Sequence, residues 1–163
     1  MQHIDLKAIL DQTAFGGHRN LVTRPTGRAV RSSIEQKLQG ADGERYAVID
    51  FGTVRCLDYS CADEIVATLL REYGSGRYFF LHGVSPSHCE AIEHVLERHE
   101  LTVVARDREG RVRVLGPIRD KAQLALSALA DTGLATREEI ADHLPIEPAT
   151  EDSSTGQTPL ASE

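Results

Sequence analysis

The sequence predicts an α/β fold with a single mixed, open sheet that is covered by helices. The first observation is a short apolar run with β-branched residues, 46–49, which ends at Asp50 and precedes apolar positions at helical spacing. The second is the same order further on, where the run 77–84 precedes a helical pattern opened by Ser85 and Pro86. Strands that alternate with helices favour a parallel sheet, because parallel strands need a crossover connection.

The N-terminal elements follow from local spacing and from breaker residues. Residues 2–14 carry apolar positions at loosely helical spacing and predict a short helix, and residues 18–24 predict the first strand. Residues 28–39 predict a second helix that ends at Gly40. Its basic flank forms either an ordinary solvated face or a surface for an acidic partner. The basic residues on or near this helix are Arg24, Arg28, Arg31 and Lys37.

The C-terminal half predicts a hairpin and then a helical extension. The runs 101–105 and 111–115 read as two strands joined by a turn at Gly110. Residues 120–130 and 136–144 then carry helical apolar patterns, and Pro145 ends the second. We therefore predict an α/β domain over 1–116, a helical extension over 117–145 and a disordered acidic tail over 146–163.

Composition limits the classes of protein and of partner. With 163 residues, 40% hydrophobic and 26% charged, the chain suits one globular domain. It has no apolar run of membrane-spanning length and no signal-peptide pattern, which predicts a cytoplasmic protein without a membrane partner. Its three cysteines are expected to be free thiols. The net charge of −7 argues against nucleic acid as the main partner.

One stretch carries a family resemblance. A strand that ends in Asp50, a short turn, and then Asp58-Tyr59-Ser60-Cys61 at the start of a helix is similar to the STAS domain. The local sequence VIDFGTV followed by SCADE is similar to the pattern of the STAS-like branch of bacterial proteins. The resemblance covers about residues 23–106. It implies a STAS-like sheet and a role like that of anti-sigma factor antagonists, which have Asp-Ser-Ser-Gly at the place of residues 58–61.

Ser60 is the sharpest candidate for a site. Local spacing predicts that Ser60 is the N-cap of its helix, with Asp63 at the third helical position. The resemblance places Ser60 on the phosphorylated serine of the antagonists. A phosphate there would meet the positive end of the helix dipole and would be opposed by Asp58, Asp63 and Glu64. These residues are expected to form a phosphorylation or partner-docking site.

Asp50 and several histidines are further candidates for a site. Asp50 ends a strand, where ligands bind in open α/β sheets, but its carboxylate can equally accept bonds from local amides. His88, Cys89, His94 and His99 do not have the spacing of helical metal ligands, so we expect no metal. We also expect no cofactor, because the chain has no Gly-rich phosphate loop.

The sequence therefore predicts a non-enzymatic regulatory module for protein–protein interaction in bacterial signalling. The resemblance implies an anti-sigma factor or a sensor-kinase-like ATPase as partner, with phosphorylation of Ser60 as the switch. The alternative is a small-molecule or nucleotide-binding sensor that uses the rim formed by Asp50 and Ser60. A hydrolase is a more distant alternative, since His82 is the one histidine well placed for a triad and nothing else supports it.

Overall fold

The computed structural model describes residues 1–13, 19–41, 43–117 and 124. The predicted helical extension over 117–145 lies outside the described residues except for Pro117 and Leu124, and the predicted tail over 146–163 lies wholly outside them. Within the described part of the chain, no helix is long and apolar enough to cross a membrane.

A mixed sheet of five strands forms the base of the domain. Its order is β1-β3-β5-β6-β7, in which the first four strands run parallel and β7 pairs antiparallel with β6. A separate short parallel pair joins β2 to β4. The strands are β1 Gln2–Asp5, β2 Asn20–Leu21, β3 Tyr46–Asp50, β4 Cys56–Leu57, β5 Tyr78–Val84, β6 Val103–Asp107 and β7 Val112–Leu115.

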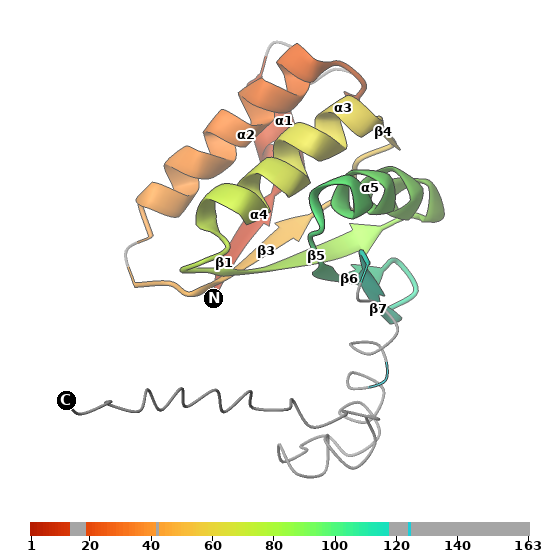
Figure 1. Ribbon diagram of the computed structural model, residues 1–163. Coiled ribbons are helices and arrows are strands. Elements are labelled where there is room, and N and C mark those ends of the chain that lie inside the picture. Colours follow the sequence, from red (N-terminus) through yellow and green to blue (C-terminus); the bar gives the residue numbers. More distant parts are fainter. Residues whose placement is uncertain (14–18, 42, 118–123, 125–163) are drawn as a thin grey trace, which may run out of the picture.

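The described helices lie together on one side of this sheet (Figure 1). α3, the π-helical segment η1 and α4 follow one another without a break, so residues 59–73 form one continuous helix. The helices are α1 Leu6–Gln12, α2 Arg24–Gln39, α3 Tyr59–Ala62, η1 Asp63–Ala67, α4 Thr68–Tyr73 and α5 Pro86–His99. The predicted α/β class with a mixed sheet is confirmed, whereas the pair β2–β4 forms a second, small sheet that was not predicted.

The core lies between the helices and one face of the sheet. Alternate residues of β3 and β5 are buried there, namely Ala47, Ile49, Phe79 and Leu81. The opposite face differs, because Tyr46 and Tyr78 are 57% and 61% exposed. The helical layer therefore protects only one of the two faces of the sheet.

The N-terminal predictions need correction. Residues 2–5 form strand β1 and only residues 6–12 are helical, so the single helix predicted over 2–14 is wrong. The strand predicted over 18–24 is reduced to Asn20–Leu21. The physical reason is that β1 gains its backbone hydrogen bonds by pairing with β3, which no local pattern reveals.

Other elements are confirmed with shifted bounds. α2 begins at Arg24, four residues earlier than predicted, because Thr23 caps it and Pro25 lies in its first turn. α2 still ends at Gly40, and α5 begins after the cap Ser85. The hairpin between β6 and β7 turns at Gly110, whose φ of 90° is a conformation that glycine adopts readily.

Candidate functional site

Asp58 and Ser60 form a small hydrogen-bonded unit at the start of the helix 59–73. The Asp58 Oδ1 atom accepts from the backbone amide of Cys61 at 2.8 Å and from the Ser60 hydroxyl at 2.8 Å. The Ser60 hydroxyl also lies 3.1 Å from Asp58 Oδ2. Asp58 is thus the N-cap, and the prediction that Ser60 fills this position is wrong.

The strand β4 explains why the cap falls on Asp58. β4 pairs with β2, and the Asp58 amide continues that ladder by donating to the Leu21 carbonyl at 2.8 Å. This holds Asp58 in the extended conformation that an N-cap requires, and it leaves Ser60 inside the first helical turn. Either residue type can cap a helix, so the sequence alone did not decide between them.

An acidic groove lies beside this unit. Tyr59, directly before Ser60, is 49% exposed, and its ring centroid is 4.7 Å from that of His94 on α5. The groove between them and the rest of α5 has a volume of about 400 Å³. It is lined by Tyr59, Pro86, Cys89, Glu90, Glu93, His94, Glu97 and Arg113. Tyr59, Glu90 and Glu93 were not predicted as site residues.

Asp63 and Glu64 belong to a different network, which joins the helix 59–73 to α2. Glu64 is 5% exposed, and its carboxylate lies 2.7 Å from Arg24 Nη1, 3.3 Å from Arg28 Nε and 3.6 Å from Arg31 Nε. Asp63 Oδ2 lies 3.1 Å from Arg24 Nη1. The predicted role of Asp63 and Glu64 as charges that face Ser60 is therefore not supported by their contacts.

The same network occupies most of the basic residues on the flank of α2. Three of the four basic residues weighed as a surface for an acidic partner, Arg24, Arg28 and Arg31, are ion-paired within the chain. Arg31 also lies 3.6 Å from Glu72. Each of these pairs joins residues more than thirty positions apart, for example 36 for Arg28 and Glu64 and 40 for Arg24 and Glu64, so sequence spacing could not predict them.

The close approach of α2 makes the network possible. A Cβ atom on Gly27 would lie 3.1 Å from Cys61 Cα and 3.2 Å from Glu64 Cβ, so a larger residue would push the two helices apart. The π-helical segment Asp63–Ala67 starts at the two acidic residues. Single π-helical turns inside α-helices are often found at functional sites.

The electrostatics of Asp63 follow from its two partners. Burial alone would raise the pKa of Asp63, but hydrogen bonds from His99 and Arg24 outweigh it and hold this pKa below its ordinary value. His99 Nε2 lies 2.8 Å from Asp63 Oδ1 and comes from the end of α5. Asp63, which belongs to the helix 59–73, therefore contacts both α5 and α2.

Asp50 ends β3 and lies in a third cluster, with His82 of β5 and His3 of β1. Its Oδ1 accepts from the Gly52 amide at 2.8 Å, as the turn-forming interpretation predicts. Its Oδ2 lies 3.4 Å from His82 Nδ1 and 3.6 Å from His3 Nε2. In the part of the chain described here, no recorded hydrogen bond or ion pair joins Asp50 to Ser60.

His88 lies apart from these clusters, at the start of α5. His88 is fully buried, and its Nδ1 accepts from the Ser85 amide at 3.2 Å as part of a capping box for α5. Burial, reinforced by the positive charge of Arg108, lowers the pKa of His88, so this imidazole is neutral. Among the described residues, no three His, Cys, Asp or Glu side chains are grouped so as to hold a metal ion.

The cysteines are free thiols in different environments. Cys56 is exposed, while Cys61 and Cys89 are buried. The Cys61 thiol donates to the Thr23 carbonyl at 3.0 Å, and burial with the nearby Asp58 raises the pKa of Cys61 to about 12. Cys61 is therefore an unreactive packing residue at neutral pH.

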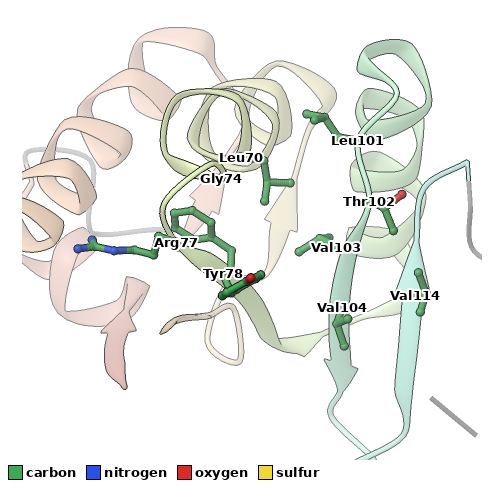
Figure 2. A pocket seen from close by; sticks show the side chains of 10 residues that line it. Leu70, Gly74, Arg77, Tyr78, Leu101, Thr102, Val103, Val104 and Val114 are labelled. Carbon is green, nitrogen blue, oxygen red and sulfur yellow. The ribbon is translucent and has the colours of Figure 1, made fainter. Parts of the chain in front are cut away.

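An apolar pocket of about 500 Å³ lies near the amino-terminal ends of β5 and β6 (Figure 2). Leu70, Leu101 and Val103 contribute to its wall. Figure 2 shows Arg77 extending away from these side chains, and its guanidinium donates to the Leu38 and Ala41 carbonyls. This pocket presents packing surface rather than acid–base groups.

Comparison of the chain with family models, curated proteins and solved structures finds no significant match.

Proposed function

We propose that this chain is a non-enzymatic regulatory module that binds a protein partner at the corner formed by Ser60, Tyr59 and α5. The observation that carries the proposal is the bond from the Ser60 hydroxyl to Asp58, the residue that caps the helix 59–73. A chemical change at Ser60 therefore acts directly on the start of this helix. The resemblance to STAS-like antagonists supports Ser60 as the place of that change.

Phosphorylation of Ser60 would act through Asp58. The hydroxyl donor would be replaced by a group with a charge of about −1.5 to −2, placed beside a carboxylate that accepts two hydrogen bonds. Like charges at this distance repel, so the phosphate and the Asp58 carboxylate have to move apart. The cap on the Cys61 amide and the position of the exposed Tyr59 are the features most directly affected.

The neighbouring groove indicates the chemistry of the docking partner. Glu90, Glu93 and Glu97 line it with a single arginine, Arg113. A partner surface with basic side chains and an aromatic or aliphatic contact for Tyr59 fits this composition. Negative charge at Ser60 repels Asp58 and disturbs the helix start that positions Tyr59. We expect the loss of the Tyr59 contact to outweigh the added attraction for a basic partner, so that phosphorylation releases the partner.

Binding of the full chain to a purified sensor-kinase-like ATPase from the same organism tests the proposal by calorimetry. Ser60→Ala is expected to keep binding and Ser60→Asp to lose it at least tenfold. Ser75→Asp is the matched control, because Ser75 is exposed at the opposite end of the helix 59–73. Incubation with ATP and peptide mass spectrometry then shows whether phosphate is added at Ser60.

Two results would contradict the proposal. If Ser60→Asp binds like the unmodified chain, Ser60 is only a partner of Asp58 in the helix start. If phosphate is found at other residues and never at Ser60, the switch lies elsewhere. A nucleotide- or small-molecule sensor at the rim of Asp50 and Ser60, the alternative reading, would instead show ligand binding that requires both residues.

A further inference from the structure

The uncovered face of the sheet carries an aromatic and aliphatic surface that continues across four strands. Tyr46 and Val48 of β3 stand beside Tyr78 and Phe80 of β5 in the parallel register, and Phe80 stands beside Val104 of β6. The rings of Tyr46 and Tyr78 stack with centroids 5.5 Å apart. Val114 of β7 pairs with Val104 and extends the same surface to the edge of the sheet.

This surface forms a groove of about 680 Å³. Apolar and aromatic side chains line its middle. Two polar groups, His82 and Arg106, lie towards the carboxyl ends of the parallel strands, and His3 flanks the groove on β1 beside Val48. A parallel sheet is normally covered on both faces, and an exposed aromatic patch of this kind marks a contact surface.

The C-terminal part of the chain begins beside this face of the sheet. β7 ends at Leu115 on the edge of the sheet, next to Val114, and residues 118–163 follow after Gly116 and Pro117. Among these residues, 120–130 carry Ala122, Ala125, Leu126 and Leu129 at positions i, i+3, i+4 and i+7. That spacing predicts one apolar helical stripe.

The exposure of Leu124 agrees with this stripe. At about 100° per residue, Leu124 lies roughly 160° around a helix from Leu126, on the opposite side. Leu124 is 52% exposed in the structure. The leucine that helical spacing places away from the stripe is thus found in contact with solvent.

We propose that residues 120–130 form an amphipathic helix whose stripe of Ala122, Ala125, Leu126 and Leu129 packs on the aromatic groove. The length is sufficient, because 11 helical residues span about 16 Å and neighbouring strands lie about 4.8 Å apart. Such a helix reaches from β6 across β5 to β3. The sheet then becomes the middle of three layers, with the helices of Figure 1 on the other side.

The occupant is a segment of this chain rather than a separate molecule, for two reasons. The segment is tethered directly beside the groove, which gives it a high effective concentration. Its small residues, Ala122 and Ala125, also permit close approach to the rings of Tyr46 and Tyr78. This inference is independent of the proposed role of Ser60, which lies on the other side of the sheet.

A tryptophan reporter tests the inference in the full chain. The natural sequence has no tryptophan, so Tyr78→Trp gives a single emission signal from the groove. We expect this emission to be shifted to the blue relative to the denatured chain. Adding Leu126→Glu and Leu129→Glu should move it towards the denatured wavelength. Leu124→Glu is the matched control and should leave the emission unchanged, because Leu124 lies off the stripe.

Nitration of the unmodified chain gives a second measurement that needs no variant. Tetranitromethane modifies accessible tyrosines. Mass spectrometry compares the rates at Tyr46 and Tyr78 with the rate at Tyr59, which does not line the aromatic groove. We expect Tyr46 and Tyr78 to react at least fivefold more slowly than Tyr59. Equal rates would overturn the inference.

Two reporter results would also overturn it. If the emission of Trp at position 78 already matches the denatured chain, nothing covers the groove. If the emission is blue-shifted but insensitive to Leu126→Glu and Leu129→Glu and dependent on protein concentration, a second copy covers it instead.

Discussion

The Ser60 hydroxyl donates a 2.8 Å hydrogen bond to the Asp58 oxygen that also caps the helix 59–73. One carboxylate thus serves both the backbone amide of Cys61 and the side chain proposed as the switch. The stability of the helix start and the chemistry at Ser60 are linked through Asp58. The consequences for stability and for binding can be measured separately.

Asp58, rather than Ser60, should dominate the stability of the helix start. Asp58→Ala removes the cap and is expected to lower the free energy of unfolding by about 1 kcal/mol. Ser60→Ala keeps the cap and, at a half-buried position, is expected to cost less than about 0.5 kcal/mol. Asp58→Asn retains a capping oxygen and serves as the control. Urea denaturation measures all three, and a larger loss for Ser60→Ala than for Asp58→Ala would contradict the geometry.

The buried Glu64 should matter more than the exposed Glu72, although both contact Arg31. Glu64→Gln removes the charge that three arginines share and is expected to lower the free energy of unfolding by about 1.5 kcal/mol. Glu72→Gln is the matched control, and its cost should stay below about 0.5 kcal/mol because Glu72 is 51% exposed. Equal costs in urea denaturation would show that the network adds no more than a surface ion pair.

Asp63 should contribute a pH-dependent part of the stability. Its folded pKa is lowered by the bonds from His99 and Arg24, which outweigh burial, while its unfolded pKa is about 3.9. The contribution is therefore fully present above the unfolded pKa and is lost as pH falls through the folded pKa. The difference in unfolding free energy between the natural chain and Asp63→Asn should be largest near pH 6 and shrink below about pH 4. A difference that grows with acidity would contradict this sign.

The three thiols should differ in reactivity. At pH 8, iodoacetamide is expected to modify the exposed Cys56 first. Cys61 should stay unmodified in the folded chain, because burial and Asp58 raise its pKa to about 12. Cys89 should also be slow, since burial raises its pKa. Peptide mass spectrometry gives the order, and equally fast labelling of Cys61 and Cys56 would show that the helix start opens easily.

The acidic segment after Pro145 should be dispensable for stability. Its sequence is dominated by proline, small polar residues and acids, so it offers little apolar surface to bury. A chain that stops at Pro145 is expected to keep its melting temperature within about 4 °C, which corresponds to roughly 1 kcal/mol at this size. Calorimetry measures the change. A larger fall would show that residues 146–163 pack on the domain.

Several elements were predictable because their signals are local. The buried strand at 46–50 and the helix after Ser85 follow from apolar periodicity and from a capping residue next to it. The turn at Gly110 follows from a glycine between two strand-like runs. In each case, the residues that carry the sequence signal are only a few positions apart.

The tertiary structure decided the features that depend on distant partners. β1 exists because residues 2–5 pair with β3, more than forty positions away, and not because of their own pattern. Asp58, and not Ser60 as predicted, caps the helix, because its backbone bond to Leu21 holds Asp58 in an extended conformation. Glu64 and the arginines of α2 came together because Gly27 allows the two helices to approach closely. The sequence by itself determined the elements with strong local signals, such as β3 and α5. Contacts between distant segments determined strand β1, the position of the cap and which charges meet, because hydrogen bonds and ion pairs depend on distance in space.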